Sequence, residues 1–201
     1  MGQVARAGVI PLSSSQDSVG PMAHSLKDAL AVLSVIQGED SDDVSTLNVN
    51  RTLDGIAPKP SLRIGALPAS KFTVATQKLY AKQLQTLKDA GHTVVNVAVK
   101  DDLSTLYVDE YAILLYDFKA EINHYLSKTP TQVTVKSLDE LIAFNIANKQ
   151  QEMPYFEQDI LQQANAVDLS EKQQYKSTKA RYRALAKRAI SNLYRNNKLD
   201  I

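Results

Sequence analysis

Hydroxyl and acidic side chains that could take part in catalysis gather near the start of the chain. Ser13, Ser14 and Ser15 are followed closely by Asp17, and the nearest candidate base is Lys27. A serine nucleophile needs a neighbouring base that can accept its proton. We expect Lys27 to lie on the solvated face of a helix, where lysine is protonated at neutral pH and cannot serve as that base. We therefore predict that the serines form a tight turn in which hydroxyls bond to nearby backbone groups.

Other catalytic and metal-binding patterns are missing from the sequence. It contains no G-x-S-x-G nucleophile elbow, Ser-x-x-Lys pair, H-E-x-x-H helix, P-loop or G-x-G-x-x-G turn. His24, His92 and His124 are scattered, and the acidic run 39–43 lacks the spacing of an EF-hand loop. We therefore predict no metal site, no cofactor and a solvated acidic loop. Without cysteine, the chain can form neither a disulfide nor a Cys-based metal site.

The composition is that of an ordinary soluble globular domain. The 201 residues are 44% hydrophobic and 22% charged, enough to bury one sizeable core. The net charge of +1 argues against a general polyanion binder. No apolar run approaches the roughly 20 residues of a membrane helix, and residues 1–15 have no apolar core like that of a signal peptide. Together with the missing cysteines, these features favour a cytoplasmic protein with no membrane partner.

The residues around the serines predict the elements that position them. Val9–Leu12 is apolar but contains Pro11, which indicates a short edge strand or an extended segment. Ser25 and Asp28 form a capping box that opens a helix. Gly38 fits the C-terminal cap of that helix. The apolar stripe of the helix comprises Leu26, Ala29, Leu30, Leu33 and Ile36.

A βαβ unit is predicted in the middle of the chain. Leu62–Leu67 and Thr93–Val99 are strand-like, and between them a helix runs from about Thr73 to Gly91. Such a unit makes a parallel pair with a right-handed crossover. Two parallel strands do not form a stable sheet alone, so either Val9–Leu12 joins them or most of the sheet belongs to sequence outside this chain.

Nearly everything after residue 100 is predicted to be helical. One apolar stripe comprises Val108, Tyr111, Leu115, Phe118, Ile122 and Tyr125. Ser137 and Glu140 form a second capping box, and Pro154 interrupts the helix that follows. A short helix is expected near Tyr155–Gln163 and a long one over 170–196. The predicted fold class is therefore α/β, rich in helix, with a βαβ unit and a helical C-terminal half.

The last predicted helix is strongly basic. Its cationic residues are Lys172, Lys176, Lys179, Arg181, Arg183, Lys187, Arg188, Arg195 and Lys198. With Tyr175, Tyr182 and Tyr194 among them, this pattern is typical of some nucleic-acid surfaces. Tyr175 and Tyr182 also form an apolar stripe with Leu185 and Ala189. We therefore favour an ordinary helix with one solvated face and expect no nucleic-acid partner.

Two polar residues have more than one interpretation. Asn145 lies on the apolar face of its predicted helix, either as a buried amide that bonds to backbone groups, which we favour, or as a pocket-lining residue. Asp17 lies close to a Gly-Pro step and is by default a turn residue.

Several motifs resemble those of the amidase-signature hydrolases. The most specific are Arg6–Leu12 (RAGVIPL) and Ser15–Ala23 (SQDSVGPMA), with Asp28-Ala29 in the following helix. The later matches are Leu114–Ala120 (LLYDFKA), Leu138–Asn145 (LDELIAFN) and, more loosely, Met153–Gln158. These later motifs are most similar to the peptide-amidase branch, rather than to the amidotransferase A subunit of glutaminyl-tRNA formation.

This resemblance implies that the chain is a middle-to-C-terminal piece of the family's α/β/α sandwich. Residues 1–201 would form a single partial amidase domain. Its parts would be the segment and loop at 1–60, the βαβ unit at 61–100 and the helical region at 101–201. Lys198–Ile201 resembles the start of a further core strand.

The resemblance also implies a reaction. In such enzymes a serine attacks an amide carbonyl, activated through a second serine in a cis peptide by a buried, neutral lysine. Backbone N–H groups stabilise the oxyanion, and water then hydrolyses the acyl-enzyme. In the family these residues precede the matched motifs, so we expect no catalytic residue in this chain.

Other site residues are implied by the motifs that they match. Asp17, with Ser15, is expected to support the active-site loop, because the family's aspartate pairs with an arginine just after the nucleophilic serine. The residues expected on the substrate side are Tyr116, Phe118, Phe156 and Gln158. For the three aromatic residues, plain core packing is the alternative.

We therefore expect part of an amidase that hydrolyses linear carboxamides, with peptide C-terminal amides as a candidate substrate class. The chain alone is expected to be inactive, and in the intact enzyme it would face a small amide or peptide-amide substrate. The alternative is a non-catalytic module from a truncated reading frame, whose exposed sheet edge and apolar face drive self-association.

Overall fold

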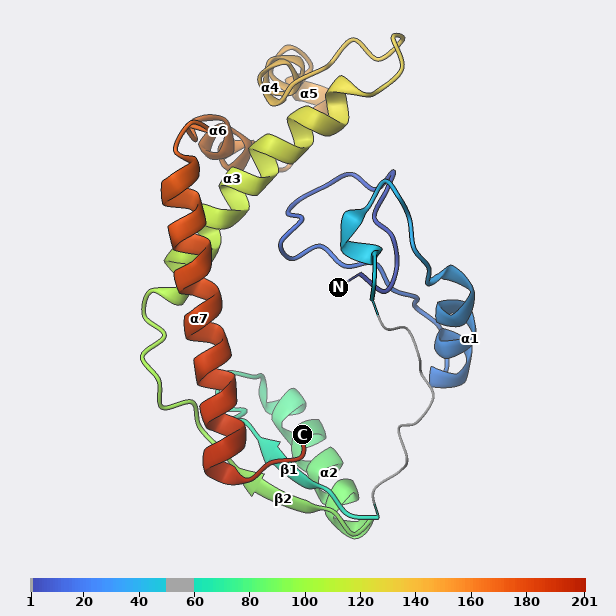
Figure 1. The fold of residues 1–201 in the computed structure, drawn as a ribbon, viewed down its shortest axis with the longest axis vertical. Coiled ribbons are helices and arrows are strands. Elements are labelled where there is room, and N and C mark those ends of the chain that lie inside the picture. Colours follow the sequence, from blue (N-terminus) through green and yellow to red (C-terminus); the bar gives the residue numbers. More distant parts are fainter. Residues whose placement is uncertain (1, 50–59) are drawn as a thin grey trace. The chain divides into compact units, whose positions relative to one another are not determined.

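The chain folds into two compact units, each built from two separate stretches of sequence. The computed structural model describes residues 2–49 and 60–201 (Figure 1). The first unit contains residues 2–49 and 111–176, and the second contains residues 60–110 and 177–201. Most elements are helices and the sheet is small and parallel, so the predicted helix-rich α/β class is confirmed. Over these described stretches, no helix combines the length and the apolar character that a bilayer crossing requires.

The second unit contains the predicted βαβ motif. Strands β1 (Arg63–Ala66) and β2 (Thr93–Asn96) run parallel, with Ile64 opposite Val94. Helix α2 (Val74–Asp89) connects them. Both strands are shorter than the ranges that the sequence predicts, and the motif itself is confirmed.

Local chemistry sets the two ends of α2. The side chain of Thr73 accepts a hydrogen bond from the backbone N–H of Thr76 and caps the first turn. At the other end Gly91 has a φ of +90°, a left-handed conformation that glycine adopts without steric strain. The N–H of His92 then donates to the carbonyl of Leu87, which closes the helix as the sequence predicts.

The last residues of the chain lie beside β1. The N–H of Asp200 donates to the carbonyl of Arg63 at 2.8 Å, and the N–H of Gly65 donates to the carbonyl of Ile201 at 2.9 Å. The two segments run in the same direction, but residues 198–201 form no strand. A Cβ at Gly65 would lie 2.6 Å from Cδ1 of Leu199, so a larger residue there would have to displace the Leu199 side chain. Strand β1 thus has backbone partners on both edges.

Two long helices contribute residues to the second unit. They are α3 (Leu106–Ser127) and α7 (Lys172–Asn197). Arg181 forms an ion pair with the buried Asp109, and Ala189 is buried on the predicted apolar stripe of α7. The ion pair therefore joins the N-terminal end of α3 to α7 within the second unit.

The hydrophobic core of the first unit lies among α3, α4 (Leu138–Ala147) and α6 (Asp159–Asn165). Its buried centre consists of Ile122, Leu138 and Ala164. The partly buried residues around this centre are Leu115, Phe118, Tyr125, Leu126, Leu141, Ile142 and Leu161. Burying a large aliphatic side chain contributes roughly 1.5–3 kcal/mol, so this cluster holds the three helices together.

The connection from α4 to α6 follows the predicted signals with one shift. The hydroxyl of Ser137 accepts from the N–H of Glu140, so the second capping box is confirmed. A short helix, α5 (Lys149–Glu152), ends before Pro154. Helix α6 begins at Asp159, later than the predicted start near residue 155.

Helix α1 (Leu26–Ile36) begins at the predicted cap. The hydroxyl of Ser25 accepts from the N–H of Asp28. The described part of the chain buries no residue of α1, and Leu26 on its predicted apolar stripe is 76% exposed. Ala29 and Leu33 of the stripe are partly covered.

The segment before α1 pairs at a different place from the one that the sequence predicts. The expected glycine cap at Gly38 is wrong, because α1 ends at Ile36 and the capping residue is Gln37, in an extended conformation. An antiparallel bridge joins Val4 to Gln37, and the N–H of Gly38 donates to the carbonyl of Gln3. Pairing with the N-terminal segment thus replaces the cap. Val9–Leu12, predicted as a strand or an extended segment, is not a strand.

Candidate functional site

The candidate site is built around residues 13–17, which we name the serine turn. The N–H groups of Gln16 and Asp17 donate to the carbonyl of Ser13 at 3.0 and 2.7 Å. Oδ2 of Asp17 accepts from the N–H groups of Leu12 and Ser13, both at 2.9 Å. The predicted tight turn is confirmed, and the Asp17 carboxylate closes it.

Asp117 of α3 collects three hydroxyls on one buried carboxylate. Ser13 and Ser15 each donate to Oδ2 at 2.6 Å, and Tyr175 of α7 donates to Oδ1 at 2.5 Å. Ser13 Oγ also accepts the N–H of Ser15 at 3.2 Å, a local bond of the predicted kind. The prediction is wrong for the hydroxyl protons, however, since both go to a carboxylate that follows Ser13 by 104 residues in the sequence.

Tyr175 is held as a hydroxyl donor in this network. Burial raises the pKa of Tyr175 to about 12, and the hydrogen bond to the Asp117 carboxylate adds to the shift. The ring stacks on Tyr116 with a centroid distance of 4.1 Å and an interplanar angle of 15°. The hydroxyl of Tyr116 donates to the carbonyl of Leu169 at 3.0 Å. Tyr175 therefore stays protonated and oriented toward Asp117 throughout the neutral pH range.

A second carboxylate of α3 binds the same turn. Glu121 follows Asp117 by four residues, so the two side chains share one face of the helix. The N–H of Ser14 donates to both Glu121 oxygens, at 2.8 and 2.9 Å. The turn is thus attached to α3 through backbone and hydroxyl groups together.

An ion pair with low exposure fixes the chain around the turn. Arg6 donates through Nη2 to Oδ1 of Asp43 at 2.8 Å and through Nε to Oδ2 at 2.9 Å, while its Nη1 donates to the carbonyl of Ser14. The hydrogen bonds from Arg6 hold the pKa of Asp43 well below its usual range, and the same contact raises the pKa of Arg6. Asp43 is only 6% exposed. The predicted solvated acidic loop is therefore wrong at this residue, because Arg6 supplies a counter-charge that permits burial.

A cavity of about 860 Å³ lies beside the serine turn, within the first unit. Val9, Ile10 and Pro11 form part of its apolar wall, and Asp17 and Lys128 add charged groups. This volume lies in the range of small-molecule sites, which are apolar cavities with a few oriented polar groups.

The aromatic residues predicted for the substrate side lie in different surroundings, and none of them lines this cavity. Phe118 packs against the core of the first unit, and Tyr116 stacks on Tyr175. Phe156 is 83% exposed, and its neighbour Tyr155 is 87% exposed. Two of the three predicted aromatic residues are thus engaged in internal packing, and the third is open to solvent.

Gln158 and Asn145 are brought together. Gln158 is buried and accepts from the amide of Asn145 at 3.0 Å, while its own amide donates to the carbonyl of Ile142 at 3.1 Å. The favoured interpretation of Asn145 as a satisfied amide fits this geometry, but its partner is a side chain rather than backbone. The pair ties the segment before α6 to helix α4.

The lysines of the first unit that form hydrogen bonds do so as donors. Lys119 donates to the carbonyls of Asn165 and Val167 at 2.5 and 2.7 Å, which satisfies the end of α6. Lys136 likewise donates to backbone carbonyls, and Lys27 is exposed as predicted. Lys119 and Lys136 are therefore engaged in binding backbone carbonyls. In residues 2–49 and 60–201, no three histidine or acidic side chains come together as metal ligands would.

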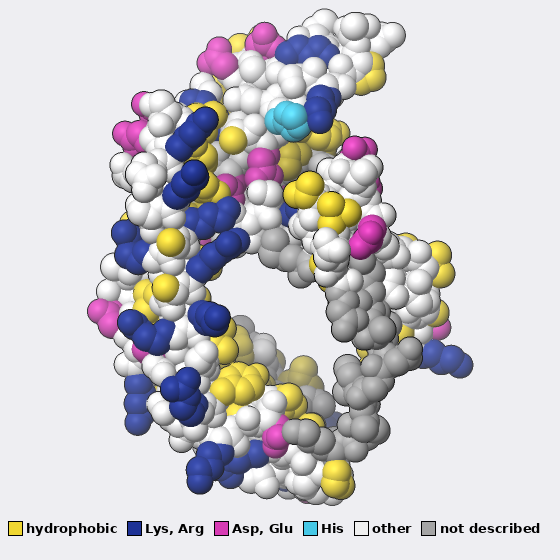
Figure 2. Space-filling model, viewed as in Figure 1, with side chains coloured by type: hydrophobic (Ala, Val, Ile, Leu, Met, Phe, Trp, Pro, Cys, Tyr) yellow, Lys and Arg dark blue, Asp and Glu magenta, His cyan; other side chains and the backbone are white. Residues whose placement is uncertain are grey.

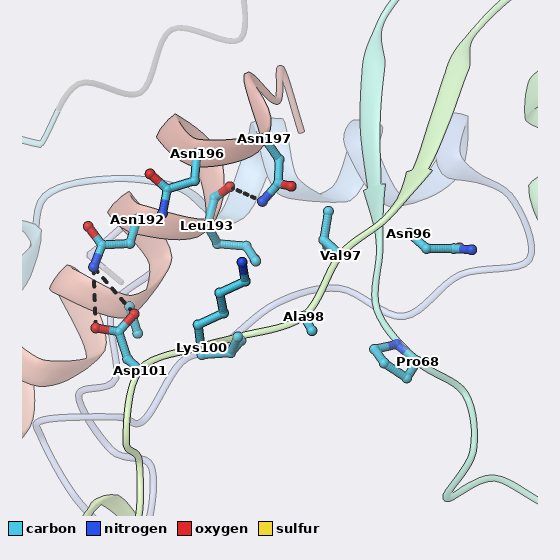
Figure 3. Close-up of a pocket in the computed structure, with 12 residues that line it drawn as sticks. Pro68, Asn96, Val97, Ala98, Lys100, Asp101, Asn192, Leu193, Asn196 and Asn197 are labelled. Atoms are coloured by element: carbon cyan, nitrogen blue, oxygen red, sulfur yellow. Dashed lines mark hydrogen bonds between the residues drawn. The ribbon is translucent and has the colours of Figure 1, made fainter.

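A smaller cavity of about 500 Å³ lies in the second unit (Figure 3). The amide of Asn192 donates to the two Asp101 oxygens at 3.2 and 3.3 Å, and the amide of Asn197 donates to the carbonyl of Leu193. Lys100 extends from the segment after β2 toward α7. None of the residues predicted for function lines this cavity, so the candidate site remains the serine turn.

The basic residues of α7 form a column of Lys and Arg side chains on the helix surface (Figure 2). Two of them have acidic partners within the second unit: Arg181 pairs with Asp109, and Arg188 lies 3.3 Å from Asp101. Other exposed members of the column are Lys172, Lys176, Arg183, Lys187 and Arg195. This distribution fits a helix with one solvated face.

Comparison with known proteins identifies the family of this chain. The model of the family described as Amidase matches residues 1–201, which is the whole chain. This chain belongs to the amidase family. The serine turn and the face of α3 that binds it are therefore parts of an amidase fold.

Solved amidase structures share this fold. The peptide amidase of Stenotrophomonas maltophilia is 32% identical over 99% of this chain, with a TM-score of 0.84. A second structure of peptide amidase, in complex with the competitive inhibitor chymostatin, gives a TM-score of 0.85 at the same identity. An amidase family protein from Bacillus anthracis is 27% identical, with a TM-score of 0.74. The predicted likeness to the peptide-amidase branch is confirmed.

The amidase chain spans about two fifths of the length of these relatives. It covers 42% of the peptide amidase and 40% of a probable amidase of Arabidopsis thaliana, to which it is 28% identical over 208 residues. The A subunit of the glutamyl-tRNA(Gln) amidotransferase of Nitratiruptor is 30% identical over an alignment that covers 55% of this chain.

Sequence reasoning missed the residues of α3 and α7 that bind the serine turn. Asp117 was visible only as part of the motif LLYDFKA, and Tyr175 only as part of an apolar stripe. One signal was available: Asp117 and Glu121 are two acidic residues four positions apart, and each directly precedes a residue of the apolar stripe. Such a pair indicates a face that accepts hydrogen bonds from another segment.

Proposed function

We propose that this amidase chain is part of an enzyme that hydrolyses linear carboxamides, with peptide C-terminal amides as the substrate class. The observation that carries the proposal is the similarity of 99% of the chain to peptide amidase, at 32% identity and a TM-score of 0.84. The motifs that surround the serine turn, RAGVIPL and SQDSVGPMA, support the same assignment.

The proposed reaction is acyl transfer to a serine. The serine oxygen attacks the amide carbonyl carbon, and its proton passes through a second serine to a neutral lysine. The C–N bond then breaks, the nitrogen leaves with that proton, and water hydrolyses the acyl-enzyme to the carboxylic acid. Backbone N–H groups stabilise the oxyanion. These groups precede the serine turn in the family's motif order, so the proposal places none of them in residues 1–201.

Asp17 and Ser15 have a supporting role in this proposal. Oδ2 of Asp17 already binds the N–H groups of Leu12 and Ser13. Among the described residues, Oδ1 of Asp17 has no hydrogen-bond donor, which leaves it available to a guanidinium. An arginine next to the nucleophilic serine would be such a donor, and a charge-assisted bond to it would transmit the shape of the serine turn to the catalytic loop.

The residues on the substrate side have two proposed roles. Phe156 is open to solvent and is proposed to contact substrate directly. Tyr116, Phe118 and Gln158 are engaged in the stack, the core and the amide pair described above. They are proposed to shape the substrate side by fixing α3 and the segment before α6.

Self-association of a non-catalytic module is the second candidate function. The observation that favours it is the exposed apolar surface of α1, where Leu26 is 76% and Val35 is 81% exposed. A size-exclusion measurement on the 201-residue chain distinguishes the two proposals. Concentration-dependent dimers or larger species support self-association, and a monomer at high concentration contradicts it.

A chimeric enzyme tests the amidase proposal. This chain would replace the matching segment of the Stenotrophomonas maltophilia peptide amidase, and ammonia release from a peptide amide would be measured. We expect a folded, active chimera, and the 201-residue chain alone should release no ammonia. A folded but inactive chimera would contradict the proposed function, and ammonia release by the chain alone would place the catalytic groups inside it.

A further inference from the structure

We infer that Asp117 is a positioning residue, which holds the serine turn on α3 for the proposed amidase reaction. Only the role of the turn in the amidase reaction rests on the proposed function. The contacts themselves, and the measurements that test them, are properties of the 201-residue chain.

The geometry gives Asp117 a single, specific task. Its carboxylate is 4% exposed and binds the hydroxyls of Ser13 and Ser15 through one oxygen, both at 2.6 Å. The other oxygen binds the hydroxyl of Tyr175 at 2.5 Å. Hydrogen bonds to an ionised acceptor are shorter and stronger than neutral ones, and three of them converge here.

The donors at Asp117 differ from those at the other buried aspartates. Asp43 and Asp109 each pair with an arginine, which neutralises the buried charge. Asp117 is satisfied by three hydroxyls, and no cation is paired with it in the described residues. A buried carboxylate has to recover its lost solvation from hydrogen bonds. The hydroxyls of the turn supply two of these bonds, so the position of the turn and the solvation of Asp117 depend on each other.

The internal and external contacts of the turn are separate. Asp17 closes the turn from within, through the N–H groups of Leu12 and Ser13. Asp117 and Glu121 attach it to α3 from outside. Loss of Asp117 should therefore loosen the contact between the turn and α3 before it opens the turn itself.

Hydrogen exchange of backbone amides, resolved by NMR on the full chain, tests this inference. In Asp117→Asn the amides of Ser14 and Ser15 should exchange at least about tenfold faster, because the hydroxyl bonds that hold the turn on α3 are weakened and the turn opens more often. The amides of the β1–β2 ladder should change by less than about twofold. Ser15→Ala removes one of the three hydroxyls without changing the buried carboxylate. It should give a smaller acceleration in the same place, and it keeps the test valid if Asp117→Asn does not fold.

Asp109→Asn is the matched control. Asp109 is also buried, but it pairs with Arg181 in the second unit, so its substitution should leave the exchange of Ser14 and Ser15 within about twofold. A titration of tyrosinate absorbance adds a second readout, which depends on the charge at position 117 as well as on the burial of Tyr175. The tyrosine that titrates near pH 12 should titrate lower in Asp117→Asn, because the carboxylate no longer opposes ionisation of Tyr175.

Two outcomes overturn the inference. One is unchanged exchange at Ser14 and Ser15 in both Asp117→Asn and Ser15→Ala. The other is equal acceleration throughout both units, which would make Asp117 a general stability residue. An inactive chimera in the amidase assay would leave these exchange results standing, so the failure of the proposed function and the failure of the positioning role are distinguishable.

Discussion

The serine turn and the β1–β2 ladder are held by different kinds of contact. The turn depends on side-chain carboxylates: Asp17 closes it, and Asp117 and Glu121 attach it to α3. The ladder depends on backbone hydrogen bonds between parallel strands and on the close approach at Gly65. A single polar substitution should therefore release the turn, whereas the ladder should respond mainly to a change in side-chain volume.

The largest expected effect is at the ion pair beside the serine turn. Arg6→Ala leaves Asp43 buried without its counter-charge, and we expect the free energy of unfolding to fall by about 3 kcal/mol. Urea unfolding followed by far-UV circular dichroism measures this loss. Arg188→Ala is the control, since this arginine is 64% exposed and its ion pair with Asp101 should contribute less than about 1 kcal/mol. Equal losses of unfolding free energy in Arg6→Ala and Arg188→Ala would show that the buried ion pair is no more important for stability than the exposed one.

A volume change at Gly65 tests the packing of the β1–β2 ladder. Gly65→Ala places a Cβ 2.6 Å from the Leu199 side chain, and we expect overpacking to reduce the free energy of unfolding by about 2 kcal/mol. Gly20→Ala is the matched control, because a Cβ at Gly20 meets no heavy atom within 4 Å. A Gly65 variant as stable as the Gly20 variant would show that the ladder tolerates added volume as readily as the open loop position at Gly20.

Acid should weaken the turn before the ladder. The pKa of Asp43 is lowered in the folded state by its hydrogen bonds to Arg6. Its contribution to stability is therefore fully present above the unfolded pKa of about 4 and declines as the pH falls through the lower folded value. We expect the difference in urea midpoint between the wild type and Asp43→Asn to shrink from pH 5 to pH 2. A difference that stays constant over this range would contradict the assigned ion pair.

The smallest expected effect comes from the tyrosine hydroxyl. Tyr175→Phe removes one hydrogen bond from Asp117, and we expect a loss of about 1 kcal/mol at pH 7. The pKa of Tyr175 is raised to about 12, so this contribution is complete below the usual pKa near 10 and declines as the pH rises toward 12. Tyr155→Phe, at an 87% exposed position, should have no measurable effect in the same urea titration.

The local elements of this amidase chain could be predicted from short stretches of sequence. Ser25 and Ser137 cap their helices as predicted, and Gly91 ends α2 in the left-handed conformation that its sequence position indicates. These features depend on hydrogen bonds between residues that are near neighbours in the chain. The βαβ motif follows from the same kind of local pattern, with errors only in the ends of its strands.

The predictions that were wrong share one physical cause. At Gly38 a bridge to Val4 replaced the local cap, and at Asp43 a counter-charge 37 residues away permitted burial. For Ser13 and Ser15 the hydroxyls bonded to Asp117 rather than to nearby backbone. In each case a distant partner competed successfully with the local one that the pattern indicated.

The sequence by itself determined the helices, the parallel strand pair, the serine turn and the likeness to amidases, because each depends on neighbouring residues or on a contiguous motif. Only the tertiary structure decided which carboxylate receives the serine hydroxyls, which aspartate is buried, and which of the candidate aromatic residues remains exposed. Burial and pairing at these positions depend on groups brought together across long stretches of chain. Local periodicity carries no information about such partners.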